Sequence, residues 1–378
     1  MSGIYIHVPF CWQRCHYCDF YSTLNLDKRK EFTEKIIIEL RNRNDFISDR
    51  KTDTIYFGGG TPSLLEPVDI SAIICEIKSV FNLSPGAEIT LEANPDDIDK
   101  DYLDSIRRAG INRLSIGIQS FDDKDLKLMN RRHDSKGAVR SVMDAYSSGF
   151  ENISIDLIYG LPGQGREDWL VNLEKAVELG PEHISAYNLT YEKGTNFYRW
   201  LKEGKIMETD DEISLNMFQK CDELLEGAGY EHYEISNYAR DGKYSRHNNK
   251  YWFGEQYLGL GPSAHSYNGE TRSWNVSNLR KWLDTDIGSP GFSSLEEIDD
   301  QTARNEMIMT RLRTKWGIPE GEYIKKFGPQ SWDELLQMAK SFLIRSQMEK
   351  TKTGLAITEK GKFLSDGIIA ELFILEDE

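Results

Sequence analysis

Ile4-Tyr-Ile-His-Val8-Pro-Phe-Cys11-Trp-Gln-Arg-Cys15-His-Tyr-Cys18 joins a short apolar run to three closely spaced cysteines near the amino terminus. The apolar run predicts a strand, and the cysteines then lie on the loop that leaves it. Their spacing is Cys-x3-Cys-x2-Cys, whereas iron–sulfur clusters are normally held by four cysteines. Three thiolates can bind three irons of a [4Fe–4S] cube and leave the fourth iron open to an exchangeable ligand. The stretch therefore predicts a cluster site at the end of the first strand.

A structural zinc site is the alternative for this loop, with His7 or His16 as the fourth ligand. Zinc-binding loops usually pair their ligands as Cys-x2–4-Cys and add a second pair elsewhere in the sequence. The other two of the five cysteines, Cys75 and Cys221, stand alone in segments with helical patterns. The cluster is therefore favoured over zinc, and Cys75 and Cys221 are interpreted as small buried apolar residues.

The composition is that of a soluble globular protein of 378 residues, with 39% hydrophobic residues and a net charge of −16. This charge disfavours nucleic-acid binding, because there is no excess of Lys and Arg to neutralise phosphates. No secretory signal is visible, and no run approaches the roughly 18 apolar residues of a membrane span. We expect a cytoplasmic protein with reduced cysteines and room for one large and one smaller domain.

Strand-like and helix-like segments alternate from residue 4 to about residue 190, which predicts six βα units and a parallel sheet. Such a sheet can stay open and doubly wound, or close partway into a barrel. Polar residues end or follow the predicted strands all along the sheet: the three cysteines, glycines 58–60, Glu92, Gln119, Asp156 and Thr190. Barrels build their sites from many strand ends, whereas a Rossmann sheet uses one switch point. The pattern favours an α/β fold with a partial (β/α)6 barrel like that of a TIM barrel.

Beyond residue 190 the alternation fades into aromatic, Gly- and Asn-rich sequence, and helical patterns return near residue 304. Residues 354–363 predict a short strand followed by a helix capped by Thr358, as at the end of a winged-helix unit. From residue 305 onward 11 Lys and Arg stand against 12 Asp and Glu, which disfavours DNA binding. We expect a barrel in residues 1–230, a connecting region in 231–300, and a smaller, mainly helical, winged-helix-like domain in 301–378 with a packing or lid role.

Two further features are compatible with a ligand site. Gly58-Gly-Gly-Thr61-Pro62 lets backbone groups approach a ligand closely, although it fits neither a dinucleotide fingerprint nor a phosphate-binding loop. Glu92, Gln119, Arg131 and Asp156 are predicted on one rim, where a carboxylate can bind ribose hydroxyls and Arg131 can pair with a carboxylate ligand. Taken singly, a tight turn and solvated or salt-bridged side chains are the alternatives.

The chain resembles the radical S-adenosylmethionine (SAM) superfamily. Besides the cysteines and Tyr17, the resemblance rests on Gly58–Pro62, Gly117-Ile-Gln119-Ser-Phe121, Asn130-Arg131 and Ile155-Asp156-Leu-Ile-Tyr-Gly160-Leu-Pro162. It implies that Cys11, Cys15 and Cys18 hold a [4Fe–4S] cluster and that SAM binds the fourth iron through its amino and carboxylate groups. It also implies further SAM contacts from Tyr5, the Tyr17 backbone, Gly59, Gly60, Thr61, Glu92, Gln119, Arg131, Asp156 and Thr190.

Within the superfamily the chain resembles the branch of the oxygen-independent coproporphyrinogen III oxidases (HemN) and the related heme chaperones (HemW). The oxidases carry a further cysteine two places after the third, where this chain has Phe20. They also carry a long amino-terminal segment, whereas the first predicted strand here begins at residue 4. Both differences favour the chaperone group.

The segment Arg246-His247-Asn-Asn-Lys-Tyr251-Trp252 contains the His-Asn-x-x-Tyr-Trp motif of that group. The resemblance implies heme binding here, with the His247 imidazole on the iron and Tyr251 and Trp252 stacked on the macrocycle. A capping or core histidine beside structural aromatic residues is the alternative. His265 is a second candidate, although its family counterpart lies near the adenosyl group of SAM.

The resemblance implies a heme chaperone that carries a SAM-coordinated cluster and passes heme to acceptor proteins, membrane cytochromes among them. A cytoplasmic location, peripheral membrane contact during transfer, a homodimer and no nucleic-acid partner are expected. The rival hypothesis is a coproporphyrinogen III oxidase of porphyrin biosynthesis, whose activity is not expected here. A third hypothesis is a zinc-stabilised barrel without redox chemistry.

Overall fold

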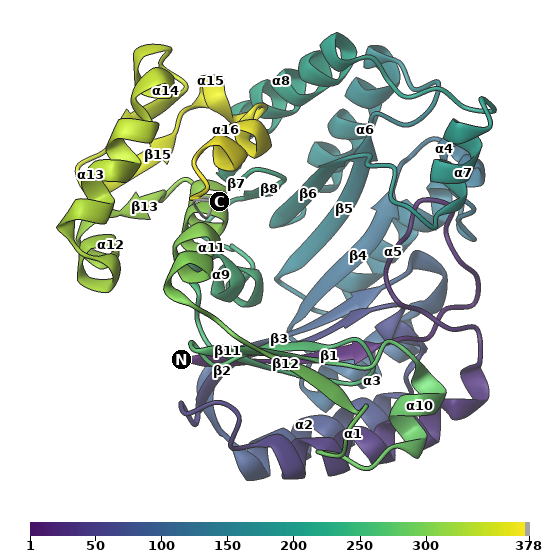
Figure 1. The fold of residues 1–378 in the computed structure, drawn as a ribbon. Helices are drawn as coiled ribbons and strands as arrows, with labels where there is room; N and C mark the ends of the chain where they lie inside the picture. Colours follow the sequence, from purple (N-terminus) through teal and green to yellow (C-terminus); the bar gives the residue numbers. More distant parts are fainter. Residues whose placement is uncertain (375–378) are drawn as a thin grey trace.

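A twelve-stranded curved sheet organises the chain, of which the computed structural model describes residues 1–374 (Figure 1). The strand order is β12-β11-β10-β9-β1-β2-β3-β4-β5-β6-β8-β7. Six strands in the middle of this order run parallel to one another: β1 (Ser2–Val8), β2 (Lys51–Gly59), β3 (Asn82–Ala93), β4 (Arg113–Gln119), β5 (Ile153–Tyr159) and β6 (His183–Asn188). They confirm the predicted partial (β/α)6 barrel.

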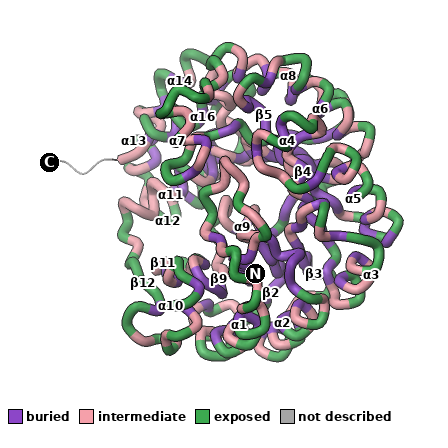
Figure 2. Tube along the Cα trace, turned by 90° about the vertical axis from the view of Figure 1, so that its right-hand side faces the viewer, coloured by how far each residue is buried: buried purple, intermediate pink, exposed green. Residues whose placement is uncertain are grey.

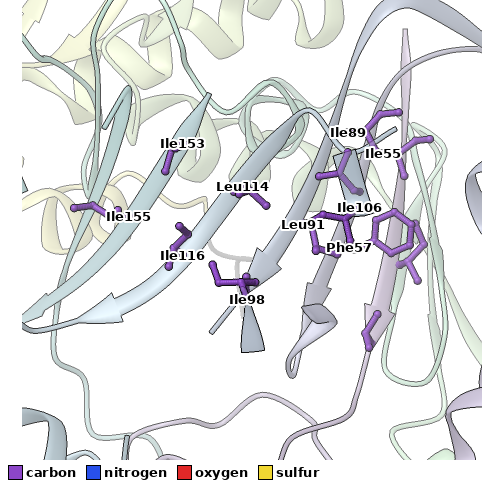
Figure 3. Close-up of a cluster of buried hydrophobic side chains, with 14 of the residues drawn as sticks. Ile55, Phe57, Ile89, Leu91, Ile98, Ile106, Leu114, Ile116, Ile153 and Ile155 are labelled. Atoms are coloured by element: carbon purple, nitrogen blue, oxygen red, sulfur yellow. The ribbon is translucent and has the colours of Figure 1, made fainter. Parts of the chain in front are cut away.

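Side chains alternate along these strands, so that each strand has an apolar outer face and a polar inner face. Leu114 and Ile116 of β4 and Ile153 and Ile155 of β5 lie in one buried cluster (Figure 3). Full burial of one such side chain stabilises the fold by about 1.5–3 kcal/mol. The outer layer therefore supplies stability, and the inner face is left to polar residues such as Asp156, which alternates with these isoleucines.

Helices cover the outer face of the sheet (Figure 1). The α3 helix illustrates how they begin and end: the Asp99 side chain accepts from the Tyr102 amide, and Gly110 closes the helix with a φ of 113°. The helices of the barrel are α1 (Arg29–Arg43), α2 (Pro67–Val80), α3 (Lys100–Ala109), α4 (Asp123–Leu128), α5 (Ser135–Ser147), α6 (Arg166–Leu179), α7 (Asn196–Lys202) and α8 (Asp211–Gly227), with 3-10 turns η1 (Leu26–Lys28), η2 (Pro62–Leu64) and η3 (Pro95–Asp97).

The predicted connecting region belongs to the same sheet, which was not foreseen. It contributes β7 (Glu231–Glu234), β8 (Asn237–Ala239), α9 (Arg246–Phe253), β9 (Tyr257–Leu260), β10 (His265–Tyr267), β11 (Thr271–Asn275), α10 (Leu279–Asp284) and β12 (Ser293–Glu297). β8 and β7 extend the edge at β6, while β9 pairs parallel with β1 and leads to β10, β11 and β12. Both edges of the central sheet are thus completed late in the sequence.

The carboxyl-terminal unit has its own hydrophobic core and a three-stranded antiparallel sheet in the order β13-β15-β14. Its elements are α11 (Asp300–Leu312), β13 (Ile318–Pro319), α12 (Glu320–Phe327), α13 (Pro329–Met338), α14 (Lys340–Ile344), β14 (Met348–Lys350), β15 (Gly354–Ile357), α15 (Glu359–Lys362) and α16 (Ser365–Glu371). Arg313 bonds Glu234 at 3.0 Å and so ties the unit to β7. This arrangement agrees with a mainly helical, winged-helix-like unit, whose expected last residues, 375–378, lie outside the described part.

Burial follows the strands, and exposed residues follow the outer helices (Figure 2). The interpretation of the two single cysteines holds for Cys221, which is buried in α8, but is wrong for Cys75, which is exposed on α2. Among residues 1–374, none of the helices combines the length and the apolar character needed to traverse a bilayer.

Candidate functional site

The cysteine loop leaves β1 at the carboxyl end of the sheet and is anchored at both ends. The Cys11 amide donates to Thr23 O at 3.0 Å, and the Thr23 amide donates to Pro9 O at 2.7 Å. The middle of the loop is held by His16, whose amide donates to Met129 O and whose carbonyl accepts from the Phe197 amide. The backbone that carries the three thiols is therefore fixed by the protein itself.

All three cysteines are partly buried, and two of their thiols lie close to a polar side chain of the rim. The Thr61 hydroxyl lies 3.5 Å from Cys11 Sγ, and Arg131 Nη1 lies 3.4 Å from Cys15 Sγ. Burial raises the pKa of Cys11, and burial raises the pKa of Cys18 to about 11. The Cys11 and Cys18 thiols therefore keep their protons until a metal displaces them, so metal binding should release protons.

The geometry disfavours a single zinc ion on this loop. Two thiolates on one tetrahedral zinc lie about 3.8 Å apart, given Zn–S bonds of about 2.3 Å. Within residues 1–374 the three sulfur atoms do not form a group with all members within 4.8 Å. His7 uses both ring nitrogens, on the Tyr5 hydroxyl and Tyr21 O, and His16 uses Nδ1 on Leu128 O. The wider spacing suits ligands that bind different metals of one cluster.

Arg131 connects the loop to the ends of β3 and β4. Its Nη2 donates to Asn94 Oδ1 and to Gly117 O, both at 2.6 Å, and Asn94 in turn donates to the Thr61 hydroxyl. Its Nε is buried and has no hydrogen-bond partner among the described residues. An unpaired guanidinium N–H at this position is available to an anionic ligand such as a carboxylate. Asn94 was missed from the sequence, although it follows the third strand directly, two residues after Glu92.

Glu92, at the end of β3, faces the glycine turn after β2. Its carboxylate accepts from the Tyr56 hydroxyl at 2.8 Å and from the Gly59 amide at 3.2 Å. Gly59 has a φ of 108°, and a Cβ there would lie 2.7 Å from the His7 ring. Only glycine therefore fits this position. Burial raises the pKa of Glu92 from its ordinary 4.5 to about 7.

The remaining predicted SAM residues divide into those near the loop and one that lies apart. Asp156 is two strands from Glu92, and its carboxylate is 3.4 Å from the Ser115 hydroxyl. Gln119 ends β4 with a φ of 70° beside Gly117. Gly60 lies against the cysteine loop, because a Cβ there would be 2.8 Å from Phe10 O. The pKa of Tyr17 is raised by burial and then by the nearby Cys15. The pKa of Tyr5 is raised by burial and then by Glu92. Thr190 is exposed beyond the end of β6 and forms no side-chain hydrogen bond within residues 1–374.

His247 lies in the protein interior, toward the amino-terminal ends of β1 and β2. It is 0% exposed, its Nδ1 is 2.8 Å from the Thr54 hydroxyl, and its Nε2 is 2.9 Å from the Tyr251 hydroxyl. Its amide donates to Glu88, four residues before Glu92 on β3, which places it about 13 Å below the rim at about 3.3 Å per residue. In Figure 1 α9 and the loop of residues 9–25 lie at opposite ends of the strands.

The expected heme surface at the His-Asn-x-x-Tyr-Trp motif is therefore not open in this structure. Both His247 nitrogens form hydrogen bonds, so the imidazole has no free lone pair for iron. The interpretation as a core histidine agrees with the structure. Tyr251 packs edge-on against Tyr257 at 4.7 Å, and Arg313 lies over the Trp252 ring at 5.5 Å. Heme binding by His247, Tyr251 and Trp252 stays a prediction that requires α9 to move.

Known proteins resemble the chain over almost its whole length. The Radical SAM superfamily model matches residues 5–176. A heme chaperone HemW of Mycobacterium tuberculosis is 31% identical, covering 98% of this chain and 94% of the relative. A heme chaperone HemW of Bacillus subtilis is 33% identical, covering 97% of this chain and 98% of the relative. The chain belongs to the HemW family of radical SAM proteins.

The fold of this HemW-family chain is also found in a solved structure. Coproporphyrinogen III oxidase (HemN) from Escherichia coli superposes with a TM-score of 0.85, covering 98% of this chain and 90% of that chain. The two sequences are 24% identical, so this likeness establishes the shared fold. It agrees with the partial barrel and the carboxyl-terminal unit described above.

Membership of the radical SAM superfamily implies a [4Fe–4S] cluster and SAM, and the observed residues fit both groups. Three protonatable thiols stand on an anchored loop, and their sulfur atoms are too widely spaced for one ion. The unpaired Arg131 Nε and the Gly59 turn lie beside them. The rim thus offers sulfur ligands for iron, a donor for a carboxylate, and acidic acceptors in Glu92 and Asp156.

The raised pKa of Glu92 predicts a pH-dependent stability in the absence of SAM. The folded-state pKa of Glu92, about 7, exceeds the unfolded value of 4.5. The stabilising contribution of Glu92 to the free energy of unfolding is therefore fully present below pH 4.5 and is lost as pH rises through about 7. The loss is on the order of 3 kcal/mol at most. Urea unfolding of the wild type and Glu92→Gln at several pH values measures it.

The difference in unfolding free energy between wild type and Glu92→Gln should fall across this pH range. Glu31→Gln, on the exposed start of α1, is the matched control and should give a constant difference. Parallel pH profiles for the wild type and Glu92→Gln would contradict the raised pKa.

Proposed function

We propose that this chain is a heme chaperone, which binds heme and transfers it to heme-accepting proteins while carrying a SAM-coordinated [4Fe–4S] cluster. One observation carries the proposal: the chain is more than 30% identical in sequence, over nearly its whole length, to relatives named heme chaperone HemW. Such coverage includes the barrel, the late strands and the carboxyl-terminal unit together. The proposal therefore concerns the whole chain and not the radical SAM barrel alone.

The cluster and SAM would be held by the rim residues. Cys11, Cys15 and Cys18 would ligate iron, and when both groups are bound the cluster can supply an electron to SAM. The buried Arg131 Nε would donate to the carboxylate of SAM, and Glu92 would accept from ribose hydroxyls. Further contacts are proposed from Tyr5, the Tyr17 backbone, Gly59, Gly60, Thr61, Gln119, Asp156 and Thr190.

The oxidase alternative lacks support on the substrate side of the loop. Phe20, where the oxidases have a further cysteine, is an exposed phenylalanine here. The shared fold with HemN does not decide between the two activities, because one barrel can support different functions. The oxidase is therefore kept as an outcome of the experiment.

Heme transfer to membrane cytochromes is the finer part of the proposal. Heme is flat and largely apolar, so its exposure to water is unfavourable. A carrier protein would shield it from water between a cytoplasmic source and a membrane acceptor. The net charge of −16 disfavours a lasting hold on anionic lipid, which suits brief peripheral contact. A homodimer is also proposed and is tested by the mass of the purified protein in solution.

Anaerobic reconstitution followed by heme titration and transfer to an apo-cytochrome tests the function. We expect saturable heme binding and appearance of the holo-cytochrome spectrum at a rate that increases with chaperone concentration. A parallel assay supplies reductant, SAM and coproporphyrinogen III. Formation of protoporphyrinogen without heme binding would overturn the proposal in favour of the oxidase.

A further inference from the structure

One histidine of the seven differs from the others in having a free ring. Six form at least one side-chain hydrogen bond within the protein: His7, His16, His133, His183, His232 and His247. His265 is exposed and forms no side-chain hydrogen bond within residues 1–374. Neither ring nitrogen is therefore engaged by another side chain in the described part of the chain.

The register of β10 and β11 places His265 on the inner face of the sheet. His265 pairs with Trp274, and the next pair is Ser266 with Ser273. Arg43 of α1 bonds both of these serine hydroxyls, so the serines lie on the helix-covered outer face. Because side chains alternate, His265 and Trp274 point the opposite way, to the face that carries the SAM site.

One aromatic ring stacks on His265, and three others contact one another further along the sheet. Its imidazole stacks on the Trp274 indole with a centroid distance of 6.0 Å and an interplanar angle of 22°. Further along, the ring centroids of Tyr267 and Tyr257 are 6.3 Å apart. The Tyr257 ring packs edge-on against the Tyr251 ring, with a centroid distance of 4.7 Å. We name these four residues, Trp274, Tyr267, Tyr257 and Tyr251, the inner aromatic wall. All four residues are partly exposed.

The imidazole of His265 is in the form that binds iron. Burial, and then the charge of Arg272, lowers the pKa of His265, so the ring is neutral at physiological pH. A neutral ring has a lone pair on one nitrogen, which is what a metal needs. Arg272 itself is bound to Glu306, so it leaves the ring free.

We propose that His265 supplies an axial imidazole to the iron of heme, with the macrocycle lying along the inner aromatic wall. The inference rests on the proposed heme-binding function and names the group that holds the cargo. Imidazole is a common axial ligand of heme iron, and aromatic side chains pack well against a porphyrin face. In contrast to His247, the His265 ring is exposed in the described conformation.

Heme titration of the full-length reconstituted protein tests the assignment, followed by absorption and electron paramagnetic resonance of the ferric heme. For His265→Ala we expect at least roughly tenfold weaker binding and loss of the imidazole-ligated spectrum. Added free imidazole should restore that spectrum. His265→Tyr should bind heme with the different spectrum of phenolate ligation, which a structural role for His265 would not produce.

His16→Ala is the competing variant, because His16 has one ring nitrogen without a hydrogen bond. Iron and sulfide content are measured for every variant, so that cluster loss is recognised. If wild-type protein binds no heme, the proposed function itself fails. If it binds heme and His265→Ala retains the wild-type affinity and spectrum, or if His16→Ala loses them instead, only the assignment to His265 is overturned.

Discussion

Replacing Cys15 by alanine is expected to abolish the iron–sulfur cluster. The remaining two thiols can bind two irons of a cube, which leaves two corners without protein ligands and an unstable cluster. The loop itself should keep its shape, because its anchors are the backbone bonds of Cys11, His16 and Thr23. After anaerobic reconstitution, iron and sulfide should fall from several atoms per chain to near zero, and the brown absorption should disappear.

Cys75→Ala is the matched control, since Cys75 is a single exposed cysteine on α2. It should retain the iron and sulfide content of the wild type. A Cys15→Ala protein with wild-type iron and sulfide would remove Cys15 from the ligand set. Purification of the wild type with zinc in place of iron would instead support the zinc hypothesis.

Replacing His247 by alanine is expected to destabilise the fold by about 2–4 kcal/mol. The change removes a buried ring that stacks on the rings of Tyr56 and Tyr5, with centroid distances of 5.1 Å and 6.3 Å respectively. It also leaves the hydroxyls of Thr54 and Tyr251 without this partner. For a chain of this size the loss corresponds to a melting temperature lower by roughly 2.5–5 °C.

His265→Ala is the control, because the exposed His265 ring makes no hydrogen bond within residues 1–374 and should leave the melting temperature nearly unchanged. Thermal unfolding followed by circular dichroism distinguishes the two variants. If His247→Ala melted like the wild type but lost heme, His247 would be a ligand reached through an open conformation. Loss of stability with heme binding retained would establish its structural role.

Local patterns predicted the parts of the fold in which the information is local. The alternation in Ile153–Ile158 and the strand-end positions of Glu92 and Gln119 follow from a period of two residues, which a short window contains. The cysteine spacing is local too. These features sufficed for the barrel and for most of the rim.

Long-range pairing explains what the sequence did not reveal. Thr54 and His247 are 193 residues apart in the sequence. No local pattern indicates that the Thr54 hydroxyl, on β2, forms a hydrogen bond with Nδ1 of that imidazole. A motif match alone therefore suggested an accessible histidine where the fold buries one. β9 beside β1 is a second case, because its four residues, Tyr257–Leu260, are too short to show a strand period.

The pairing of β1 with β9 also has a consequence for the newly made chain. β1 gains its neighbour β2 early, but its other side stays unpaired until Tyr257–Leu260 have left the ribosome. At about 5–20 residues per second, the roughly 200 residues between β2 and β9 take roughly 10–40 s to synthesise. During that time the first strand made is an open sheet edge next to three free thiols. Assembly in the cell thus passes through a stage at which edge-to-edge aggregation competes with completion of the barrel.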